Sequence, residues 1–598
     1  MKKTMIALCV ASLGMLTSAT AATVKDGVYQ GSAQGRNGDI TVSVTFKAGK
    51  IKAVKVLKQS ETLGISDAAL KTLPEKIAKA NSVAVDSVAG ATLTSNGIRR
   101  AVMDAIKRAG GDAYTYSTLP IMAFKDGKDI QKSADILVVG AGGAGVSAAV
   151  RAASQGAKVL LVEKMPMIGG ATILNAGTLI ATGSRYQREV MKETKDSPEL
   201  AAKDMMRVGK NQNDPVLVEM VTHKVGGVVD WLIDDMKIPY GPAATQYPDH
   251  SANRQLGVKG RSVNYLNLMM DRYKHFGGQI MLGVKTDKLL TDSTGRVIGV
   301  RGFDQDGNRV TVSAKATILA TGGFGAYKPL LPDEMRQYVF YGLDSETGDG
   351  LKMASNVGAG ITNIDLVKKY PQGVETTPGH GLAATASSTD TMKKSGAIYV
   401  NQDGKRFVNE RASLGELTDA TIAQPNHIAY IVMDKAAWDV YVAKSLEDKL
   451  VPNKEALQAW AKIVNHGHPV MAQGANLASV AQKMGINPQG LTATVTDWNT
   501  MVKNGTDTAF DRPITSGLGA GPYTIVEQKV RYQTTLGGLK ANAQLQILTP
   551  DGKAIPGLYG AGSVVGGANG ADSMTAMMNS WAIVSGVVAA DSAVKALK

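Results

Sequence analysis

The stretch Asp135-Ile-Leu-Val-Val-Gly-Ala-Gly-Gly-Ala-Gly145 decides how the larger part of this 598-residue chain folds. Its first five residues are almost continuously apolar, as strands of a parallel sheet buried on both faces are. Gly140 to Gly145 then follow the spacing G-x-G-x-x-G. This spacing permits a tight turn and brings the amides of a helix N-terminus close to a pyrophosphate. The stretch therefore predicts a strand, a glycine-rich turn and a helix that bind a dinucleotide.

Later segments extend the same pattern. A second apolar strand, Lys158–Val162, ends at Glu163, which lies where a carboxylate reaches a ribose hydroxyl. A further buried strand is predicted at Ala316–Ala320, and the stretch Gly557–Gly562 leads into a glycine-rich run and a helix from about Ser573 to Val594. We therefore predict an α/β, Rossmann-like domain made of residues 134–365 and 534–598, with residues 366–533 inserted as an α+β capping domain. Within the insertion, helical patterns cover Ala456–Val464 and Leu491–Lys503.

A smaller unit precedes this domain. Alternating apolar residues predict strands at Asp39–Phe46 and Lys52–Leu57, joined as a hairpin. Two helical patterns follow, Ala68–Ala80 and Asn96–Ala109, and the second ends at a glycine pair. Residues 24–110 therefore predict a small α+β domain, and residues 111–133 a linker.

The first residues predict an exported protein. Lys2 and Lys3 precede an apolar run from Met5 to Leu16, and Ala19-Thr-Ala21 fits a cleavage site. This is the order of a secretory signal peptide, here residues 1–21, which places the mature protein in the periplasm. The apolar run is too short for a bilayer core of about 30 Å, and we predict no membrane span.

Composition excludes several classes of protein. Cys9 is the only cysteine, so a disulfide scaffold, a cysteine-ligated metal site and covalent c-type haem are excluded within the chain, and no metal site is predicted. The net charge is +14, but the positive residues are scattered. Without a basic run, nucleic acid is not expected as a partner.

The loops after Glu163 favour FAD over NAD. Lys164–Thr172 and Asn175-Ala-Gly177 place a second small-residue loop behind the carboxylate, and Gly560-Ala-Gly-Ser563 adds a third. From Asp135 onward the chain resembles the fumarate reductase flavoprotein family, in particular its soluble periplasmic members such as flavocytochrome-type fumarate reductases and urocanate reductases. The resemblance implies non-covalent FAD bound by Gly140, Ala144, Glu163, Gly170, Thr172, Gly177, Val284, Asp349 and Gly562. Ala171 and Ser563 depart from the family's usual Asn and Glu.

A second flavin is implied in the first domain. Asp86-Ser-Val-Ala-Gly-Ala-Thr92 resembles the FMN-binding module, in which the last threonine of D-x-x-(S/T)-G-A-T carries FMN through a phosphoester bond. The resemblance implies covalent FMN on Thr92, attached by an FMN transferase. Ala89 departs from the motif, and Thr94 and Ser95 are alternative hydroxyl acceptors.

The family's substrate residues are only partly retained. Members move a hydride from flavin N5 to an activated C=C bond and usually protonate the neighbouring carbon with an arginine. By resemblance, Tyr370 stands in the place of a histidine, Thr389-Asp390 in that of a Thr-Glu pair, and Lys393 in that of a relay arginine. Leu414 occupies the place of the acid arginine, Thr534 that of a histidine, and Ser573 that of a carboxylate-binding arginine.

These losses disfavour a dicarboxylate substrate, whose charge would be buried without partners. The candidate acids are Tyr370, Asp390 with Lys393, Arg411 and Asp572, and the candidate substrate contacts are Tyr370, Thr389, Thr534 and Ser573. We expect an exported reductase that passes electrons from an external cytochrome through FMN and FAD to the C=C bond of a small organic acceptor. Two alternatives stay open: a urocanate or fumarate reductase of anaerobic respiration, and a two-flavin electron carrier without its own organic substrate.

Overall fold

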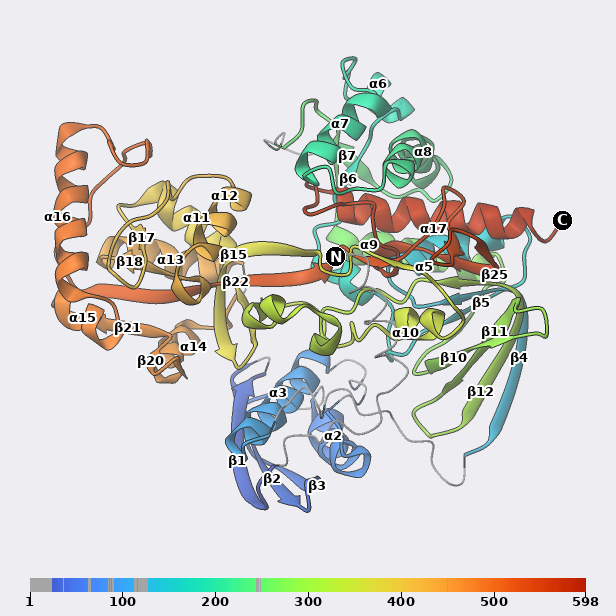
Figure 1. Cartoon of the computed structure of the whole chain (residues 1–598), viewed down its shortest axis with the longest axis horizontal. Coiled ribbons are helices and arrows are strands. Elements are labelled where there is room, and N and C mark those ends of the chain that lie inside the picture. Colours follow the sequence, from blue (N-terminus) through green and yellow to red (C-terminus); the bar gives the residue numbers. More distant parts are fainter. Residues whose placement is uncertain are drawn as a thin grey trace. The chain divides into compact units, whose positions relative to one another are not determined.

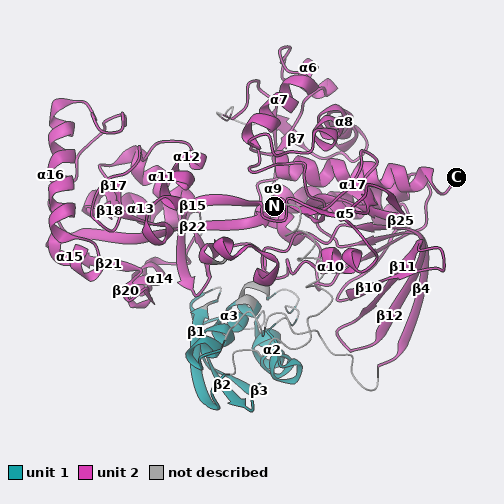
Figure 2. Cartoon of the chain, in the orientation of Figure 1, with its two compact units in different colours: residues 1–122 teal, residues 123–598 magenta. Residues whose placement is uncertain are grey.

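A computed structural model of the chain describes residues 24–35, 37–62, 66–83, 85, 88, 91–111, 116, 127–242, 247, 249–448 and 450–598. The chain divides into two compact units, residues 1–122 and 123–598 (Figure 2). The predicted signal peptide, most of the Asp86–Thr92 motif and the Thr92 side chain lie outside the described residues.

In its described residues, the first unit contains an antiparallel three-stranded sheet followed by two helices. Its order is β1 (Gly27–Gln34), β2 (Asp39–Lys47), β3 (Lys50–Lys58), followed by α2 (Asp67–Ala80) and α3 (Thr92–Arg108). The alternation in β2 buries Val42, Val44 and Phe46 on one face. Helix α3 lies so close to β1 that a Cβ on Gly31 would stand 2.0 Å from the Ala101 carbonyl oxygen. The predicted hairpin and both helices are present, and β1 is an additional strand.

The second unit contains the predicted parallel sheet (Figure 1). Its strands lie in the order β10 (Lys285–Thr291), β11 (Val297–Phe303), β12 (Arg309–Leu319), β4 (Asp129–Val139), β5 (Val159–Val162), β9 (Gln279–Met281). From β12 to β9 the pairing is parallel, and β25 (Ala554–Gly560), itself paired with β24 (Gln546–Leu548), adds to β12. Strand β4 begins at Asp129, inside the segment predicted as a linker.

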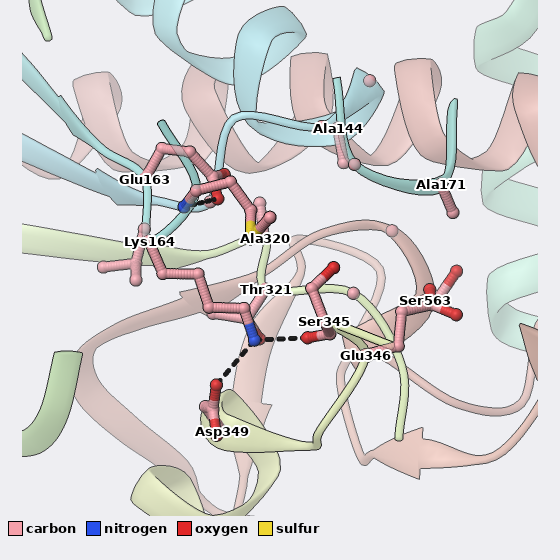
Figure 3. A pocket seen from close by; sticks show the side chains of 18 of the residues that line it. Ala144, Glu163, Lys164, Ala171, Ala320, Thr321, Ser345, Glu346, Asp349 and Ser563 are labelled. Atoms are coloured by element: carbon pink, nitrogen blue, oxygen red, sulfur yellow. Dashed lines mark hydrogen bonds and ion pairs between the residues drawn. The ribbon is translucent and has the colours of Figure 1, made fainter. Parts of the chain in front are cut away.

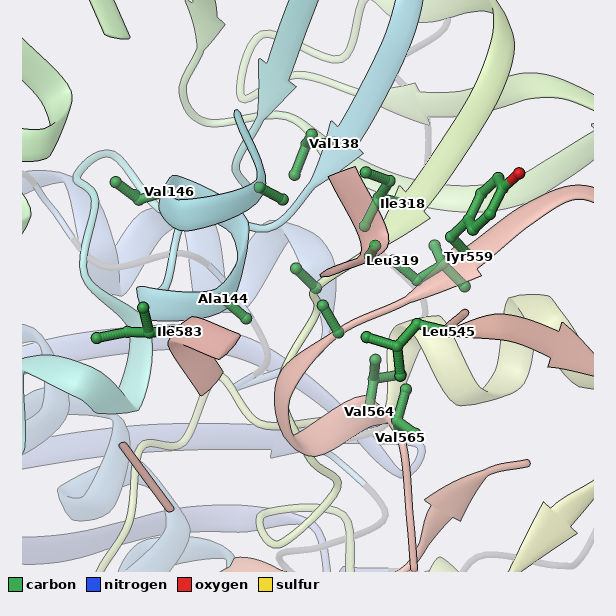
Figure 4. Close-up of a cluster of buried hydrophobic side chains, with 14 of the residues drawn as sticks. Val138, Ala144, Val146, Ile318, Leu319, Leu545, Tyr559, Val564, Val565 and Ile583 are labelled. Atoms are coloured by element: carbon green, nitrogen blue, oxygen red, sulfur yellow. The ribbon is translucent and has the colours of Figure 1, made fainter. Parts of the chain in front are cut away.

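Two helices far apart in sequence pack together against this sheet. Helix α5 (Gly143–Ser154) contacts α17 (Met577–Lys595) so closely that a Cβ on Gly586 would lie 2.3 Å from the Ala144 carbonyl oxygen. Their apolar side chains join those of β4, β12 and β25 in one core, part of which Figure 4 shows. Within the described residues, α17 alone is long and apolar enough to cross a membrane, but 72% of that window is buried in the protein, so core packing accounts for its composition.

The capping domain is built on a second sheet, ordered β13 (Val339–Phe340), β16 (His380–Ala383), β15 (Val367–Thr377), β22 (Tyr523–Thr535), β18 (Ile428–Met433), β17 (Ile398–Val400). β21 (Met471–Gly474) also pairs with β22. Every residue of β18 is buried, because separate apolar clusters cover the two faces of the sheet. The long strands β15 and β22 run between this domain and the parallel sheet (Figure 1).

The remaining elements cover the two sheets. In the dinucleotide domain they include α6 (Arg185–Glu189), α7 (Pro198–Val208), α8 (Pro215–Asp234), α9 (Arg261–His275), α10 (Asp349–Ser355) and the small sheet β6 (Leu179–Ile180), β8 (Gln255–Val258), β7 (Tyr240–Pro242). In the capping domain they include α11 (Thr385–Lys394), α12 (Leu414–Ile422), α13 (Lys435–Glu447), α14 (Lys454–Gln458), α15 (Leu477–Lys483) and α16 (Pro488–Asn504). The two helical patterns predicted there correspond to α14 with the following 3₁₀ turn, and to α16.

Candidate functional site

The turn between β4 and α5 forms the floor of a pocket. Gly140 has φ +103°, and a Cβ there would lie 2.3 Å from the Ala320 carbonyl oxygen. A Cβ on Gly145 would lie 1.7 Å from the Gly140 carbonyl oxygen. A Cβ on Gly142, in contrast, would meet nothing closer than 3.8 Å, so the backbone there borders open space. The glycines thus allow tight packing on one side and leave a cradle on the other.

The pocket lies at the carboxyl ends of β4, β5 and β12, where open α/β sheets bind their ligands. Figure 3 shows the residues around it. Both departures from the family pattern, Ala171 and Ser563, line it. Eight of the nine predicted FAD contacts line it as well: Gly140, Ala144, Glu163, Gly170, Thr172, Val284, Asp349 and Gly562.

Gly177, the ninth predicted contact, does not line this pocket. Its amide donates to Asn175 Oδ1 at 2.6 Å, and a Cβ on it would lie 2.4 Å from the Val258 side chain. With φ +81°, the position needs glycine for the backbone conformation and the close approach to its neighbours.

Charged groups in the pocket are held in place by the protein. Glu163 accepts hydrogen bonds from the amides of Ala141 at 2.6 Å and Met165 at 2.7 Å. Lys164 Nζ lies 2.8 Å from Asp349 Oδ2. Burial raises the pKa of Asp349, but Lys164 and Lys285 outweigh it and hold that pKa well below its ordinary value. Asp349 therefore remains an anion that neutralises Lys164.

Other polar atoms of the pocket lack partners. Among the described residues, Thr321 Oγ1 and Glu346 Oε2 are buried without a hydrogen bond. Burial raises the pKa of Glu346 to about 7. Buried polar atoms of native proteins are usually satisfied, so these two indicate a missing polar ligand. Three features of the pocket fit FAD. The open backbone at Gly142 fits the pyrophosphate, the carboxylate of Glu163 fits the ribose, and the two unpaired atoms fit polar ring edges.

A second cluster lies where β15 and β22 join the two sheets. Tyr370 and Arg531 are register partners on these strands. The guanidinium carbon of Arg531 lies 3.9 Å from the ring centroid of Tyr341 and 4.6 Å from that of Tyr370. The two rings meet edge to face, with centroids 6.0 Å apart. We call Tyr341, Tyr370 and Arg531 the tyrosine–arginine cluster.

Arg531 is 3% exposed, yet its guanidinium group has few partners. Its Nη2 donates to Thr385 Oγ1 at 2.5 Å, whereas Nε and Nη1 have no hydrogen-bond partner among the described residues. Burial raises the pKa of Tyr370, although Arg531 and a hydrogen bond with Tyr341 act in the opposite direction. Tyr370 therefore keeps its proton at neutral pH.

Asp572 and Ser573 lie beside this cluster. Lys368 Nζ forms an ion pair with Asp572 and lies 3.3 Å from the Ser573 carbonyl oxygen. The same Nζ lies 4.9 Å from the ring centroid of Tyr370. Ser573 Oγ donates to Asn569 Oδ1 at 2.8 Å. The structure thus brings two of the predicted residues, Tyr370 and Asp572, to one cation, Lys368.

Other predicted catalytic residues make different contacts. Asp390 pairs with Lys394 at 2.7 Å on α11, and Lys393 is exposed. Arg411 donates to the carbonyl oxygens of Met392 at 3.1 Å and Lys393 at 2.7 Å, where it binds the end of α11.

The other predicted substrate contacts, Thr389 and Thr534, lie on α11 and β22. Thr389 is half-buried on α11, and Thr534 is half-buried near the end of β22. Leu414, in the place of the family's acid arginine, is 39% exposed at the start of α12.

Sequence reasoning missed Arg531 and Tyr341. One signal was available, because all 13 residues of β22 are buried or half-buried, and an arginine inside such a strand is unusual. Its position opposite Tyr370 depends on long-range register, which no local pattern specifies.

In the first unit, the two alternative hydroxyl acceptors are buried. Thr94 Oγ1 donates to a carboxylate oxygen of Glu61, and Ser95 Oγ accepts from the amide of Val88 at 3.0 Å. Thr94 is 3% exposed and Ser95 is fully buried. Thr92 is the first residue of α3.

Comparison with known proteins supports both flavin-binding domains. The FAD binding domain family matches residues 135–577, and the FMN-binding domain family matches residues 35–107. Urocanate reductase from Eggerthella lenta is 29% identical over 551 residues, which are 90% of this chain and 87% of that protein. Fumarate reductase (cytochrome) from Shewanella frigidimarina is 31% identical over 473 residues, 77% of each chain. A solved structure of a flavocytochrome c3 fumarate reductase in its open conformation superposes with a TM-score of 0.64 at 27% identity over 78% of each chain.

Fold, pocket and matches define a flavin-dependent oxidoreductase with an FAD-binding and an FMN-binding domain. Within that class, the chain belongs to the fumarate and urocanate reductase flavoprotein family, whose members act on C=C bonds.

Proposed function

We propose that this protein is an exported reductase that takes electrons from an external donor through FMN and FAD and reduces the activated C=C bond of a small organic acceptor with at most one carboxylate. The observation that carries the proposal is the tyrosine–arginine cluster. Among the described residues, it offers one cation without an anion, where the family pattern has several cationic groups, because Leu414 and Ser573 replace two arginines and Thr534 replaces a histidine.

Charge balance supports the limit of one carboxylate. Lys368 is already neutralised by Asp572, so Arg531 is the cation of this region that lacks an anion among the described residues. A second buried carboxylate would lose its hydration without gaining a partner, at a cost of several kcal/mol.

The protein's own residues would position the acceptor and supply a proton. When bound, FAD supplies the hydride. Tyr370 is protonated at neutral pH and lies against Arg531, which would stabilise the tyrosinate left after the hydroxyl proton moves to the acceptor carbon. Lys368, over the face of the same ring, adds to that stabilisation.

The first unit would receive the electrons. We propose that FMN is covalently attached to Thr92 by a transferase, because Thr94 and Ser95 are buried and hydrogen-bonded. The sequence contains no CxxCH motif, so the haem of a cytochrome donor would belong to a partner protein. The predicted signal peptide supports export to the periplasm, which would be the place of this exchange.

A single-turnover experiment tests the reductase proposal. The holoenzyme is reduced, and its flavin reoxidation is followed with a panel of alkenes that carry none, one or two carboxylates. We expect fast reoxidation by conjugated alkenes with one carboxylate and slow reoxidation by fumarate. Reoxidation fastest with fumarate would overturn the limit of one carboxylate and favour the respiratory alternative, whereas urocanate carries one carboxylate and falls within the proposed class. Reoxidation by none of the alkenes, but by a cytochrome, would favour the electron-carrier alternative.

A further inference from the structure

We propose that Arg531 is the carboxylate anchor of the acceptor site and sets its specificity for a monoanionic alkene. This inference rests on the proposed function, because it assigns the substrate-binding group of the same site. Arg531 is none of the residues that the family pattern predicts, since the family's positions fall on Leu414, Thr534 and Ser573.

The surroundings of Arg531 differ from those of comparable arginines. Three arginines in the described part of the second unit are buried: Arg254, Arg512 and Arg531. The first two form ion pairs, Arg254 with Asp196 at 2.7 Å and Arg512 with Glu410 at 3.2 Å. Arg531 forms none with the described residues, and two of its nitrogens lack any hydrogen bond. A buried cation without an anion is costly, so an anionic ligand is the simplest completion of this site.

The geometry of the cluster suits a carboxylate. Thr385 takes one N–H of Nη2, and Nε and Nη1 are unpaired among the described residues, so an edge of the guanidinium group remains for a ligand. A carboxylate accepts two parallel N–H bonds along such an edge, a geometry that a lysine cannot reproduce. Thr385 accepts from Nη2 and thereby holds the side chain in this orientation.

The cluster also limits the rest of the ligand. Tyr341 and Tyr370 are both half-buried, and aromatic rings of this kind pack against a flat conjugated body. Lys368 is paired with Asp572 and adds no net charge. The chemical class that fits is therefore a conjugated alkene with one carboxylate, bound through that carboxylate to Arg531.

The test uses one alkene with two, one or no negative charges: fumarate, monomethyl fumarate and dimethyl fumarate. Each is titrated into the oxidised holoenzyme, where no turnover occurs, and binding is read from the change in flavin absorbance. We expect wild-type protein to bind monomethyl fumarate at least about ten-fold more tightly than either of the others. Equal or tighter binding of dimethyl fumarate by the wild-type protein overturns the proposal, whatever the variants do.

Arg531→Gln should weaken binding of monomethyl fumarate about ten- to a hundred-fold, the loss expected for charge-assisted hydrogen bonds, and leave dimethyl fumarate unchanged. Arg531→Lys should be intermediate. Lys369→Gln is the matched control, because this neighbour of Tyr370 on β15 lies 5.5 Å from the Tyr338 ring instead, and it should bind all three as wild type does. An equal loss for the monoester and the diester in Arg531→Gln would contradict the anchor role.

The two proposals fail in different ways. If no alkene reoxidises the reduced flavins, the reductase proposal is wrong. If alkenes reoxidise them but Arg531→Gln keeps the wild-type preference for the monoanion, the reductase proposal stands and the anchor proposal is wrong.

Discussion

At the scale of single residues, Tyr370 combines the properties of a proton donor. Burial keeps its hydroxyl protonated, and two cations lie against its ring. Tyr370→Phe should lower turnover roughly 10²- to 10⁴-fold, as loss of a general acid does, while FAD content stays unchanged. Tyr430→Phe, a buried tyrosine of the capping sheet, is the control and should keep its turnover. Similar losses in both variants, or loss of FAD in Tyr370→Phe, would argue against the acid role.

Glu346 gives the pocket a pH dependence. Burial raises its pKa from 4.5 to about 7, so the folded state holds this proton more tightly than the unfolded state. The stabilising contribution is complete below about pH 4.5 and is lost as pH rises through about 7, an effect on the order of 3 kcal/mol. Glu346→Gln should therefore lose less stability than wild type between pH 5 and pH 8. Chemical unfolding at both pH values measures this, and parallel losses in the two proteins would refute the assignment.

The predicted FAD contacts that line the pocket lie on a local sequence pattern. Gly140 belongs to the glycine-rich turn, and Glu163 follows the next strand along the chain. Arg531 acts through its place opposite Tyr370, which depends on the pairing of strands far apart in the chain. The candidate acids Asp390 and Arg411 rest on the family resemblance, and the structure gives both other partners.

At the scale of elements, the contact between α5 and α17 leaves no room for a side chain. A Cβ on Gly586 would lie 2.3 Å from a backbone oxygen, so Gly586→Ala should destabilise the protein by about 1–3 kcal/mol and lower its FAD content. Gly227→Ala is the matched control, because Gly227 is exposed in the interior of α8 with nothing within 4 Å of its Cβ position. That change should be neutral or stabilise the protein by up to about 1 kcal/mol. Thermal unfolding that ranks the two variants in the opposite order would contradict the packing argument.

The start of α3 carries the prediction for the second flavin. Thr92→Ala should abolish the flavin fluorescence that remains with the denatured protein, and FAD should still be released in the same amount. Thr94→Ala should keep the fluorescence, because its hydroxyl is buried against Glu61. Loss of the label in Thr94→Ala alone would move the attachment site.

Elements of the parallel sheet were predictable because their strands are short apolar runs followed by glycine turns. The capping sheet was not, because β15 and β22 carry polar residues such as Lys369 and Gln528 among apolar ones and gain their order from pairing with each other. Strand β1 was also missed, since three of its eight residues are Gly31, Ser32 and Ala33, which have no strong strand preference.

At the scale of the whole molecule, the predicted export has a simple chemical signature. Cleavage after Ala21 would remove Cys9, the only cysteine, and leave a mature chain without thiols. Protein from the native host should have an intact mass that lacks residues 1–21, and it should not react with thiol reagents. Recovery of the unprocessed chain from the cytosol would contradict the prediction.

Helix α17 also has a consequence for how the molecule is assembled. Its Ser585 hydroxyl accepts from the Gly562 amide at 2.8 Å, and its Trp581 indole donates to the Gly562 carbonyl at 3.1 Å. Gly562, which lines the pocket beside Ala144, is therefore positioned by a helix that follows it in the chain. During synthesis, the dinucleotide site cannot close until this helix has emerged and docked, so flavin capture is a late event in biogenesis. A nascent chain stalled before Met577 should be unable to retain FAD.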